Sequence, residues 1–547
     1  MTPARSRSPG GAFGKELRDA RLPVAGLSLA LVALIAGSAA SFGNSYRTAA
    51  SRLAFVRLAR EIPPPLRGLY GNPFPAHLAT LGGMISLKDS TWSIGLVSFW
   101  SILALTGALT RDRHRPGAEH EAVAPLPPRR LAWQKIGAHA LALAIVVSFA
   151  GAAAWLSSRA FGPLPGDAIT WEGAAGFAVT AGLMALAAGG LALLLAQMVS
   201  RPAAVGATGA YLVAGAMVYG YQGAVPAFAG WTRLTWFAWT RYQQPLAGSY
   251  AWASLLPVAL FAAAGLALGV ELLARRDLSG RQHRLRRPSL APGLRSATAR
   301  SLRERLPAAT AWGTGLGLYG LVLAASDRGI AGAIRASPAG TLALLHRLFP
   351  GVPVATAGGF LEIAFAALGY LLAGAAATAI LRGWAREEAS RRTELLLSAP
   401  VSRTRWFLAT ATGTLAAIAV MAVLISAGVG IGAGLAGSAA AVPAAGAVTL
   451  GVYSITVAAI GIGAGGLVRP GAGPLLAGIF VAATFLDELI APGLSLPGWV
   501  HGLALTSHLG MPMIGQWSWG GIAACAAITV AAAGCGAAGF ARRDVSR

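Results

Sequence analysis

Residues 386–406 read REEASRRTELLLSAPVSRTRW, a charged run between two long apolar stretches. A weaker copy, RDRHRPGAEHEAVAPLPPRRL, occupies 111–131 between two other apolar stretches. Both copies keep the same order: an acidic residue, an Ala-Pro pair and an arginine. They are Glu119, Ala124-Pro125 and Arg130 in the first copy, and Glu394, Ala399-Pro400 and Arg405 in the second. This pairing suggests that the chain is built from two similar halves.

The apolar stretches decide the fold class. The chain has 547 residues, of which 55% are hydrophobic and 12% charged. Apolar runs of about 20 residues cross a bilayer, and in lipid such runs form helices because their backbone groups must be satisfied internally. We therefore predict an all-α polytopic membrane protein with twelve transmembrane helices, at about 22–42, 92–110, 136–157, 175–199, 203–221, 251–272, 307–326, 359–382, 406–430, 445–468, 471–488 and 518–540.

Other markers of duplication recur in the same order. Ala274-Arg275-Arg276-Asp277 follows the sixth predicted span, and Ala541-Arg542-Arg543-Asp544 follows the twelfth. Arg201-Pro202 and Arg469-Pro470 each separate the fourth and fifth spans of a half. We predict two parallel six-helix repeats, a geometry that suits a central pathway. The expected domains are residues 1–272, an Arg-rich cytoplasmic linker with an interfacial helix at 273–306, and residues 307–547.

Basic residues set the expected orientation. The net charge is +24, and Lys and Arg concentrate in the segments that lie on one side if both termini are cytoplasmic. Cytoplasmic loops carry such an excess. We therefore expect a multi-pass protein of the bacterial plasma membrane with both termini inside, and no binding of nucleic acid. In the long outer loop, 43–91, the run SRLAFVRLAR at 51–60 predicts a helix that ends before Pro63.

Catalytic motifs are missing from the sequence. No G-x-x-x-x-G-K-[ST] loop is present, and the eight His residues form no metal-binding spacing. The glycine runs at 313–320 and 428–437 fall inside predicted spans, where small residues let helices approach closely. Of the acidic residues near span ends, only Glu362 lies about a turn inside. The chain is therefore predicted not to be an enzyme and to bind neither a metal nor a cofactor.

The segment 386–406 is predicted to dock a soluble partner. Acidic and basic residues alternate up to Glu394, three leucines follow, and Pro400 ends the helical pattern. A solvated loop would explain the arginines but neither the acids nor the leucines. The residues expected to couple the chain to its partner are Glu387, Glu388, Glu394, Leu396, Pro400, Arg403 and Arg405, with Glu119, Pro125 and Arg130 in the first copy.

TELLLSAPVSRTRW at 393–406 resembles the segment between the second and third spans of ABC-2 type transporter permeases. The whole chain is similar to the fused, two-half permeases of actinobacterial antibiotic exporters of the tetronasin type. The resemblance implies that a separate ABC ATPase, as a dimer, binds the ATP and Mg²⁺. It also implies that hydrophobic drugs pass between the halves, near the aromatic residues Phe99, Trp100, Tyr211, Tyr219, Phe365, Tyr370, Phe480 and Phe485. The first copy departs from the pattern, since His120-Glu121-Ala122-Val123 replaces the leucines, and the two ATPase contacts are expected to be unequal.

Other classes of function remain open on the residues alone. A proton-coupled secondary multidrug carrier of the major-facilitator type would also have twelve spans in parallel halves. It should keep ionisable groups deep in its spans, which the sequence does not show. A membrane-embedded transferase would need clustered acidic or His residues, and a non-transporting scaffold would need neither.

Overall fold

The computed structural model describes residues 11–61, 76–111, 127–199, 201–223, 228–275, 296–336, 351–356, 358–389, 401–490 and 502–543, together with positions 68, 339, 342, 343, 346 and 499. The chain divides into two compact units, Met1–Leu285 and Arg286–Arg547. The division falls inside the range 273–306, where the sequence predicts a linker. Both units are built from long helices, as predicted.

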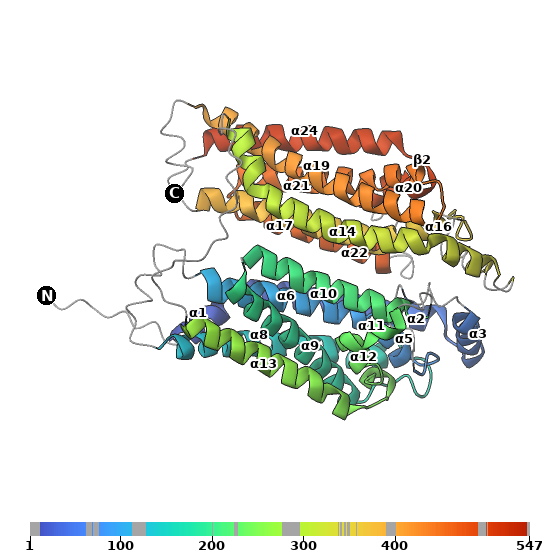
Figure 1. Ribbon diagram of the computed structural model, residues 1–547. Coiled ribbons are helices and arrows are strands. Elements are labelled where there is room, and N and C mark those ends of the chain that lie inside the picture. The colour runs from blue at the N-terminus through green and yellow to red at the C-terminus, as the bar shows by residue number, and fades with distance from the viewer. Residues whose placement is uncertain are drawn as a thin grey trace. The chain divides into compact units, whose positions relative to one another are not determined.

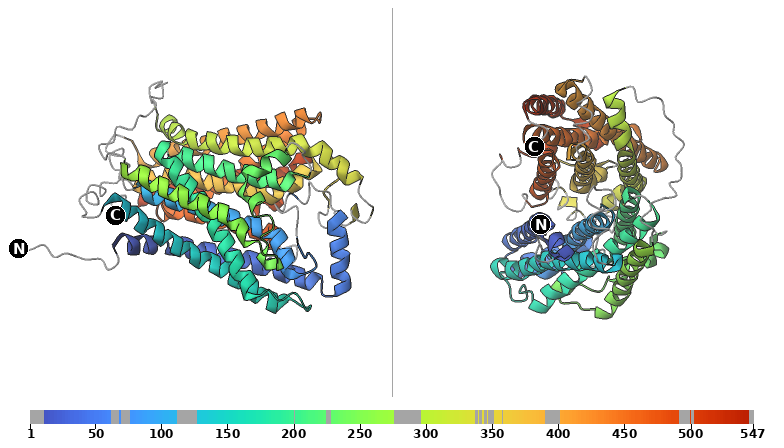
Figure 2. Two further views of the ribbon diagram at one scale, coloured as in Figure 1. Left: turned by 60° about the horizontal axis from the view of Figure 1, so that its bottom comes forward. Right: turned by 90° about the vertical axis from the view of Figure 1, so that its left-hand side faces the viewer.

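Unit 1 is a bundle of long helices with short helices at one end (Figure 1). Helix α3, at the end of this bundle, runs across the direction of the long helices (Figure 2) and covers the predicted run 51–60. That prediction is confirmed. The elements are α1 (Gly11–Asp19), α2 (Arg21–Ser45), α3 (Ala49–Glu61), α5 (Leu81–Lys88), α6 (Ser90–Arg111), α8 (Pro128–Phe161), α9 (Trp171–Met198), α10 (Arg201–Tyr221), α11 (Phe228–Trp231), α12 (Trp236–Trp239) and α13 (Leu255–Arg275).

Unit 2 is a second bundle of long helices with one small hairpin. Strands β1 (Gly510–Met511) and β2 (Gln516–Trp517) pair antiparallel. A π-helical turn, Phe365–Gly369, separates α16 from α17 inside the predicted eighth span. The helices are α14 (Ala297–Arg335), α16 (Gly359–Ala364), α17 (Tyr370–Ala389), α19 (Arg403–Leu435), α20 (Ala441–Gly446), α21 (Val448–Leu467), α22 (Ala472–Ile490) and α24 (Trp519–Arg542).

The two units share one order of neighbouring helices. In unit 1, α9 packs against α6, α8, α10 and α13. In unit 2, α21 packs against α17, α19, α22 and α24, which are the corresponding helices. Helix α2 packs against α8, as α14 does against α19. The same central helix and the same neighbours are what a duplicated sequence would produce.

Small residues bring α14 and α19 together. A Cβ atom on Gly428 would overlap the carbonyl oxygen of Gly317, so only glycine permits this approach. The prediction that the two glycine runs serve helix packing is therefore confirmed.

Helix α14 differs from expectation at its start, because it continues through Pro307 instead of beginning there after a separate interfacial helix. The Ser301 hydroxyl, which donates to the Thr410 carbonyl oxygen at 2.7 Å, holds the first turns of α14 on α19.

Nine helices within the described residues are long and apolar enough to cross a membrane. The remaining predicted spans, 203–221, 359–382 and 471–488, coincide with α10, with α16 and α17, and with α22. The chain is a multi-pass membrane protein. We call the end of each unit where α6 or α17 finishes and α8 or α19 begins the charged end. The opposite end, which holds residues 244–252 in unit 1 and 510–519 in unit 2, is called the hairpin end.

Candidate functional site

The segment 386–406 begins in a charge cluster of unit 2, to which its residue Glu387 belongs. Glu387, on the last turn of α17, receives a hydrogen bond of 3.0 Å from Nη2 of Arg305 on α14. Arg300, one turn earlier on α14, lies 3.3 Å from the other carboxylate oxygen of Glu387. Glu304 lies within 4 Å of both arginines. We call Arg300, Glu304, Arg305 and Glu387 the α14–α17 cluster.

This cluster is held in place from several sides. The side chain of Arg305 is only 3% exposed and that of Glu387 only 9%. Arg305 also donates to the backbone oxygen and the hydroxyl of Ser301, both at 2.9 Å. Burial opposes ionisation of Glu387, but a hydrogen bond with Glu304 and the charges of Arg305 and Arg300 outweigh it, so the pKa of Glu387 lies below its ordinary value. Glu387 is therefore held as a carboxylate between two guanidinium groups.

The far side of the segment is fixed to α24. The Ser402 hydroxyl caps α19 by accepting from the backbone N–H of Arg405. Arg403 donates to the carbonyl oxygen of Arg543 at 2.9 Å, and Arg543 donates in turn to the carbonyl oxygen of Gly465 on α21. Arg543 belongs to the Ala-Arg-Arg-Asp motif that follows the last span. Arg543 of this motif thus meets the start of α19.

Unit 1 has a comparable but exposed connection. Arg129, on the first turn of α8, lies 2.7 Å from the carboxylate of Glu271 on α13, and Arg275 binds the same oxygen. These side chains are 61%, 33% and 74% exposed, respectively. In both units the start of the third long helix is therefore tied to the end of the last one, through an exposed ion pair in unit 1 and through a backbone carbonyl in unit 2.

The predicted coupling residues are distributed around these contacts. Glu387 and Arg403 belong to them, whereas Arg405 and Arg130 are exposed at the starts of α19 and α8. Glu388 lies in α17, and its side chain is outside the described part. Outside the described residues lie Glu119, Pro125, Glu394, Leu396 and Pro400.

The predicted pathway aromatics are mostly packed within their own unit. Tyr370, at the π-turn, shares a hydrogen bond of 3.1 Å with Thr449, and Phe365 meets Tyr319 edge to face. Tyr211 donates to the carbonyl oxygen of Leu234. Tyr219 lines a cavity in unit 1. Phe99, Trp100 and Phe480 are half-buried, and Phe485 is buried.

A matching pair of hairpins, which the sequence analysis missed, closes the opposite end of each unit. Hairpin 1 (residues 244–252) and hairpin 2 (510–519) both contain a three-residue helical turn that begins with a proline and is followed by a left-handed glycine, Gly248 at φ 75° and Gly515 at φ 82°. Each ends in a stacked aromatic pair, Tyr250–Trp252 and Trp517–Trp519. The signal was readable as P-x-x-G-x-[YW]-x-W, spaced like the Ala-Arg-Arg-Asp motifs.

Buried acids support the hairpin end of unit 2. Glu362, 6% exposed, accepts a hydrogen bond of 2.8 Å from the backbone N–H of Met513 in hairpin 2. Asp327, in the C-terminal part of α14, accepts from the backbone N–H of Gly358 at 2.7 Å. Both carboxylates therefore satisfy backbone donors of the surrounding loops. The position of Glu362 near a span end is visible in the sequence, but its partner Met513 is 151 residues away in the chain.

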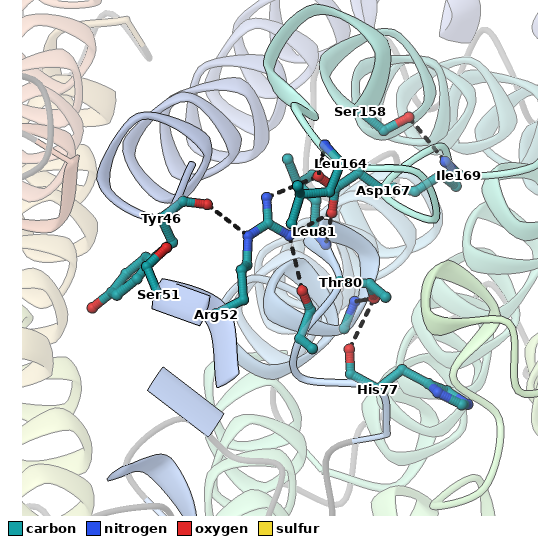
Figure 3. Close-up of polar contacts among 12 residues, drawn as sticks. Tyr46, Ser51, Arg52, His77, Thr80, Leu81, Ser158, Leu164, Asp167 and Ile169 are labelled. Carbon is teal, nitrogen blue, oxygen red and sulfur yellow. Dashed lines mark hydrogen bonds and ion pairs between the residues drawn. The ribbon is translucent and has the colours of Figure 1, made fainter. Parts of the chain in front are cut away.

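Unit 1 is held at its hairpin end by a buried ion pair (Figure 3). Arg52 of α3 makes a two-pronged contact with Asp167 in the loop between α8 and α9, and their side chains are 1% and 2% exposed. Arg52 also donates to the carbonyl oxygens of Tyr46 and Ala79. Asp167 accepts from the backbone N–H of Leu81, the first residue of α5. One pair thus fixes α3, α5 and the α8–α9 loop together.

These features define a class of protein before any comparison is made. Long apolar helices with charged segments at one end are typical of a multi-pass membrane protein, and the described residues hold no cluster of metal-binding side chains. Residues 294–541 match the family model described as the multidrug efflux system permease Rv1217c, C-terminal domain. The match covers nearly all of unit 2 and supports a multidrug efflux permease. No curated protein matches the chain.

Proposed function

We propose that the chain is the membrane subunit of an ATP-driven exporter, which moves hydrophobic antibiotics or drugs out of a bacterial cell. A separate ABC ATPase, acting as a dimer, would hydrolyse the ATP and bind the Mg²⁺. The observation that carries this proposal is the fixing of both ends of the segment 390–400. The match of residues 294–541 to a multidrug efflux permease supports it independently.

The contacts at the charged end of unit 2 suit the transmission of force. A partner that moves the segment 390–400 pulls on α17 at Glu387, and Arg305 passes this displacement to α14. On the other side Arg403 passes it to the end of α24. A buried, hydrogen-bonded charge pair resists separation because each charge would otherwise remain buried alone. Movement of one short segment would therefore displace long helices of the unit.

Twelve spans in two parallel repeats, with both termini in the cytoplasm, complete the proposal. The shared order of helix neighbours in the two units supports the repeats. The orientation rests on the Lys and Arg residues, which gather at the charged ends. The segments 112–126 and 390–400 would then both face the cytoplasm, where the ATPase is.

Charge reversal in the segment tests the coupling. Arg405 is preferred to Arg403 for this purpose, since Arg403 also holds Arg543 and its loss would disturb the fold. Glu394→Arg and Arg405→Glu are expected to reduce both the co-purification of the ATPase and the efflux of a fluorescent hydrophobic drug. The matched changes in the first copy, Glu119→Arg and Arg130→Glu, are expected to have smaller effects. Unchanged association and efflux in the unit 2 variants would end the proposal.

The rival proposal is a proton-coupled secondary carrier. It gains little support from Glu362, because the carboxylate of this residue already bonds to the backbone of hairpin 2. Efflux from cells depleted of ATP but still holding a proton gradient separates the two. Efflux that persists in those cells, and stops when the gradient is removed, would favour the carrier.

A further inference from the structure

A cavity at the hairpin end of unit 1 contains polar groups without a partner. It has a volume of about 60 Å³ and lies between α5, the start of α6, α9, α10 and the residues that lead into hairpin 1. Gln243 and Ser86 line it and are only 6% and 3% exposed. The Nε2 amide of Gln243 and the hydroxyl of Ser86 have no hydrogen-bond partner within the described residues. Buried polar groups are rarely left in this state, so they indicate a missing ligand or water.

The orientation of Gln243 is fixed, which leaves one group free for a ligand. Its Oε1 atom accepts a hydrogen bond from the backbone N–H of Ala251 in hairpin 1. The amide nitrogen must therefore be the group without a partner, and it is a pure donor. The buried side chain of Tyr219 also lines the cavity.

The charges around the cavity favour an anion. Arg241 lines the cavity, is exposed and forms no ion pair within the described residues; its guanidinium lies over the ring of Tyr242 at 4.5 Å. Among the described residues, no acidic side chain lines the cavity. Asp89 is close in sequence to Ser90 of the lining, but its carboxylate accepts from Ser38 on α2 instead. Burial raises the pKa of Asp89 to about 7, and Lys88 and Ser38 only partly oppose this.

The walls and the volume define the rest of the ligand. Phe177 and Phe237 line the cavity beside the polar groups. Because a water molecule takes about 30 Å³ of liquid volume, the space holds about two waters or one small oxyanion. Guanidinium and amide donors bind carboxylate and phosphate oxygens well. We propose that this cavity binds the oxyanion group of an acidic amphipathic molecule, whose apolar part extends past Arg241 and Tyr242. The oxyanion belongs either to a free amphipath or to an anionic lipid.

The test uses the purified full chain and two probes. Binding of radiolabelled decanoate is measured in uncharged detergent, with 1-decanol and decyltrimethylammonium as competitors of equal tail length. In the second arm, the retention of phosphatidic acid is measured by mass spectrometry after purification from nanodiscs of phosphatidylcholine and phosphatidic acid. We expect saturable binding of at least one probe, with no competition from the alcohol or the cation.

Two substitutions locate the binding. Arg241→Gln removes the cation at the mouth, and Gln243→Glu keeps the acceptor for Ala251 while it replaces the donor by an anionic oxygen. Loss of one charge-assisted hydrogen bond weakens binding by about tenfold to a hundredfold. Arg233→Gln, an equal charge change at a residue that does not line the cavity, should leave binding unchanged.

Each outcome decides the matter. Decanoate binding that depends on Arg241 and Gln243 supports the site with a free amphipath as source, and retention of phosphatidic acid alone with the same dependence supports a lipid as source. Absence of binding by both probes, or binding that neither substitution changes, would mean that the cavity holds only water. The ATPase takes no part in these experiments, so the result is independent of the proposed function.

Discussion

Breaking the Arg305–Glu387 pair should destabilise unit 2 and weaken its coupling to a partner. Arg305→Met leaves Glu387 buried beside Glu304, with Arg300 as its one remaining cation in the cluster. Removal of one member of a buried pair costs about 3–5 kcal/mol. For a domain of this size, each kcal/mol lowers the melting temperature by roughly 2–4 °C, so a loss of roughly 6–20 °C is expected. The assay is thermal unfolding of the purified chain in detergent.

The double variant separates the charge effect from simple loss of packing. Arg305→Met with Glu387→Met removes both charges and keeps the side-chain volume, so most of the lost stability should return. Arg129→Met, at the exposed pair of unit 1, should change the melting temperature only slightly because exposed pairs contribute little. If Arg305→Met and Arg129→Met had equal effects, or if the double variant were as unstable as the single one, the cluster would not act as a buried ion pair.

The same pair gives a pH dependence of known sign. The pKa of Glu387 is lower in the folded chain than in the unfolded one. A lowered pKa in a carboxyl group stabilises the fold above the unfolded pKa, and this contribution is lost as the pH falls through the folded value. The difference in melting temperature between the parent and Glu387→Gln should therefore shrink on acidification. A difference that grew on acidification would contradict the assignment.

Three further predictions concern the hairpin ends. Arg52→Met should lower the free energy of unfolding by about 3–5 kcal/mol, measured by heat or denaturant. The control Arg47→Met loses only an exposed contact with Asn44 and should change this free energy by no more than about 0.5 kcal/mol. Equal effects of the two changes would contradict the role of the buried pair. Gly515→Ala should destabilise the fold by about 1–2 kcal/mol because the φ of Gly515 is positive. Gly520→Ala, at a position of α24 with open space around it, should stabilise the fold by up to about 1 kcal/mol. Stability changes of the same sign in both variants would contradict this prediction. Glu362→Gln keeps an acceptor for Met513 and should preserve drug efflux, whereas loss of efflux in a normally folded variant would indicate proton coupling.

The position of the long helices could be read from the sequence because lipid leaves the backbone few options. Helices cover every apolar range that was predicted, most of them with ends within a few residues, but α8 begins at Pro128 and α14 spans Ala297–Arg335, well beyond the predicted 136–157 and 307–326. Two details could not be read this way. The π-turn at Phe365–Gly369 interrupts a range with no proline, and α14 continues through Pro307, where a helix start was expected. Packing against neighbours overrides the local preference in both places.

The candidate site was predicted only in part, because its partners are far apart in the sequence. Glu387 and Arg403 were identified from the charge pattern, but nothing in that pattern identifies Arg305, 82 residues away, as the partner of Glu387. The pair of Arg52 and Asp167 spans 115 residues and was missed for the same reason. The hairpins were different, since their repeated Pro, Gly and Trp residues were visible in the sequence. Spacing alone shows that two motifs are copies, but only the fold shows what each residue touches.

The two charged ends differ in exposure, and this difference fits the proposal that the two partner contacts are unequal. In unit 2 the Arg305–Glu387 pair of the α14–α17 cluster is buried, so water and salt screen it little and its geometry persists as conditions change. In unit 1 Arg129, Glu271 and Arg275 are exposed, and salt weakens such pairs. A partner that pushes on both copies would therefore meet a stiff connection at 386–406 and a compliant one at 111–131. Raising the ionic strength should increase this difference, so that charge reversal at Glu394 remains harmful to efflux while reversal at Glu119 loses its effect.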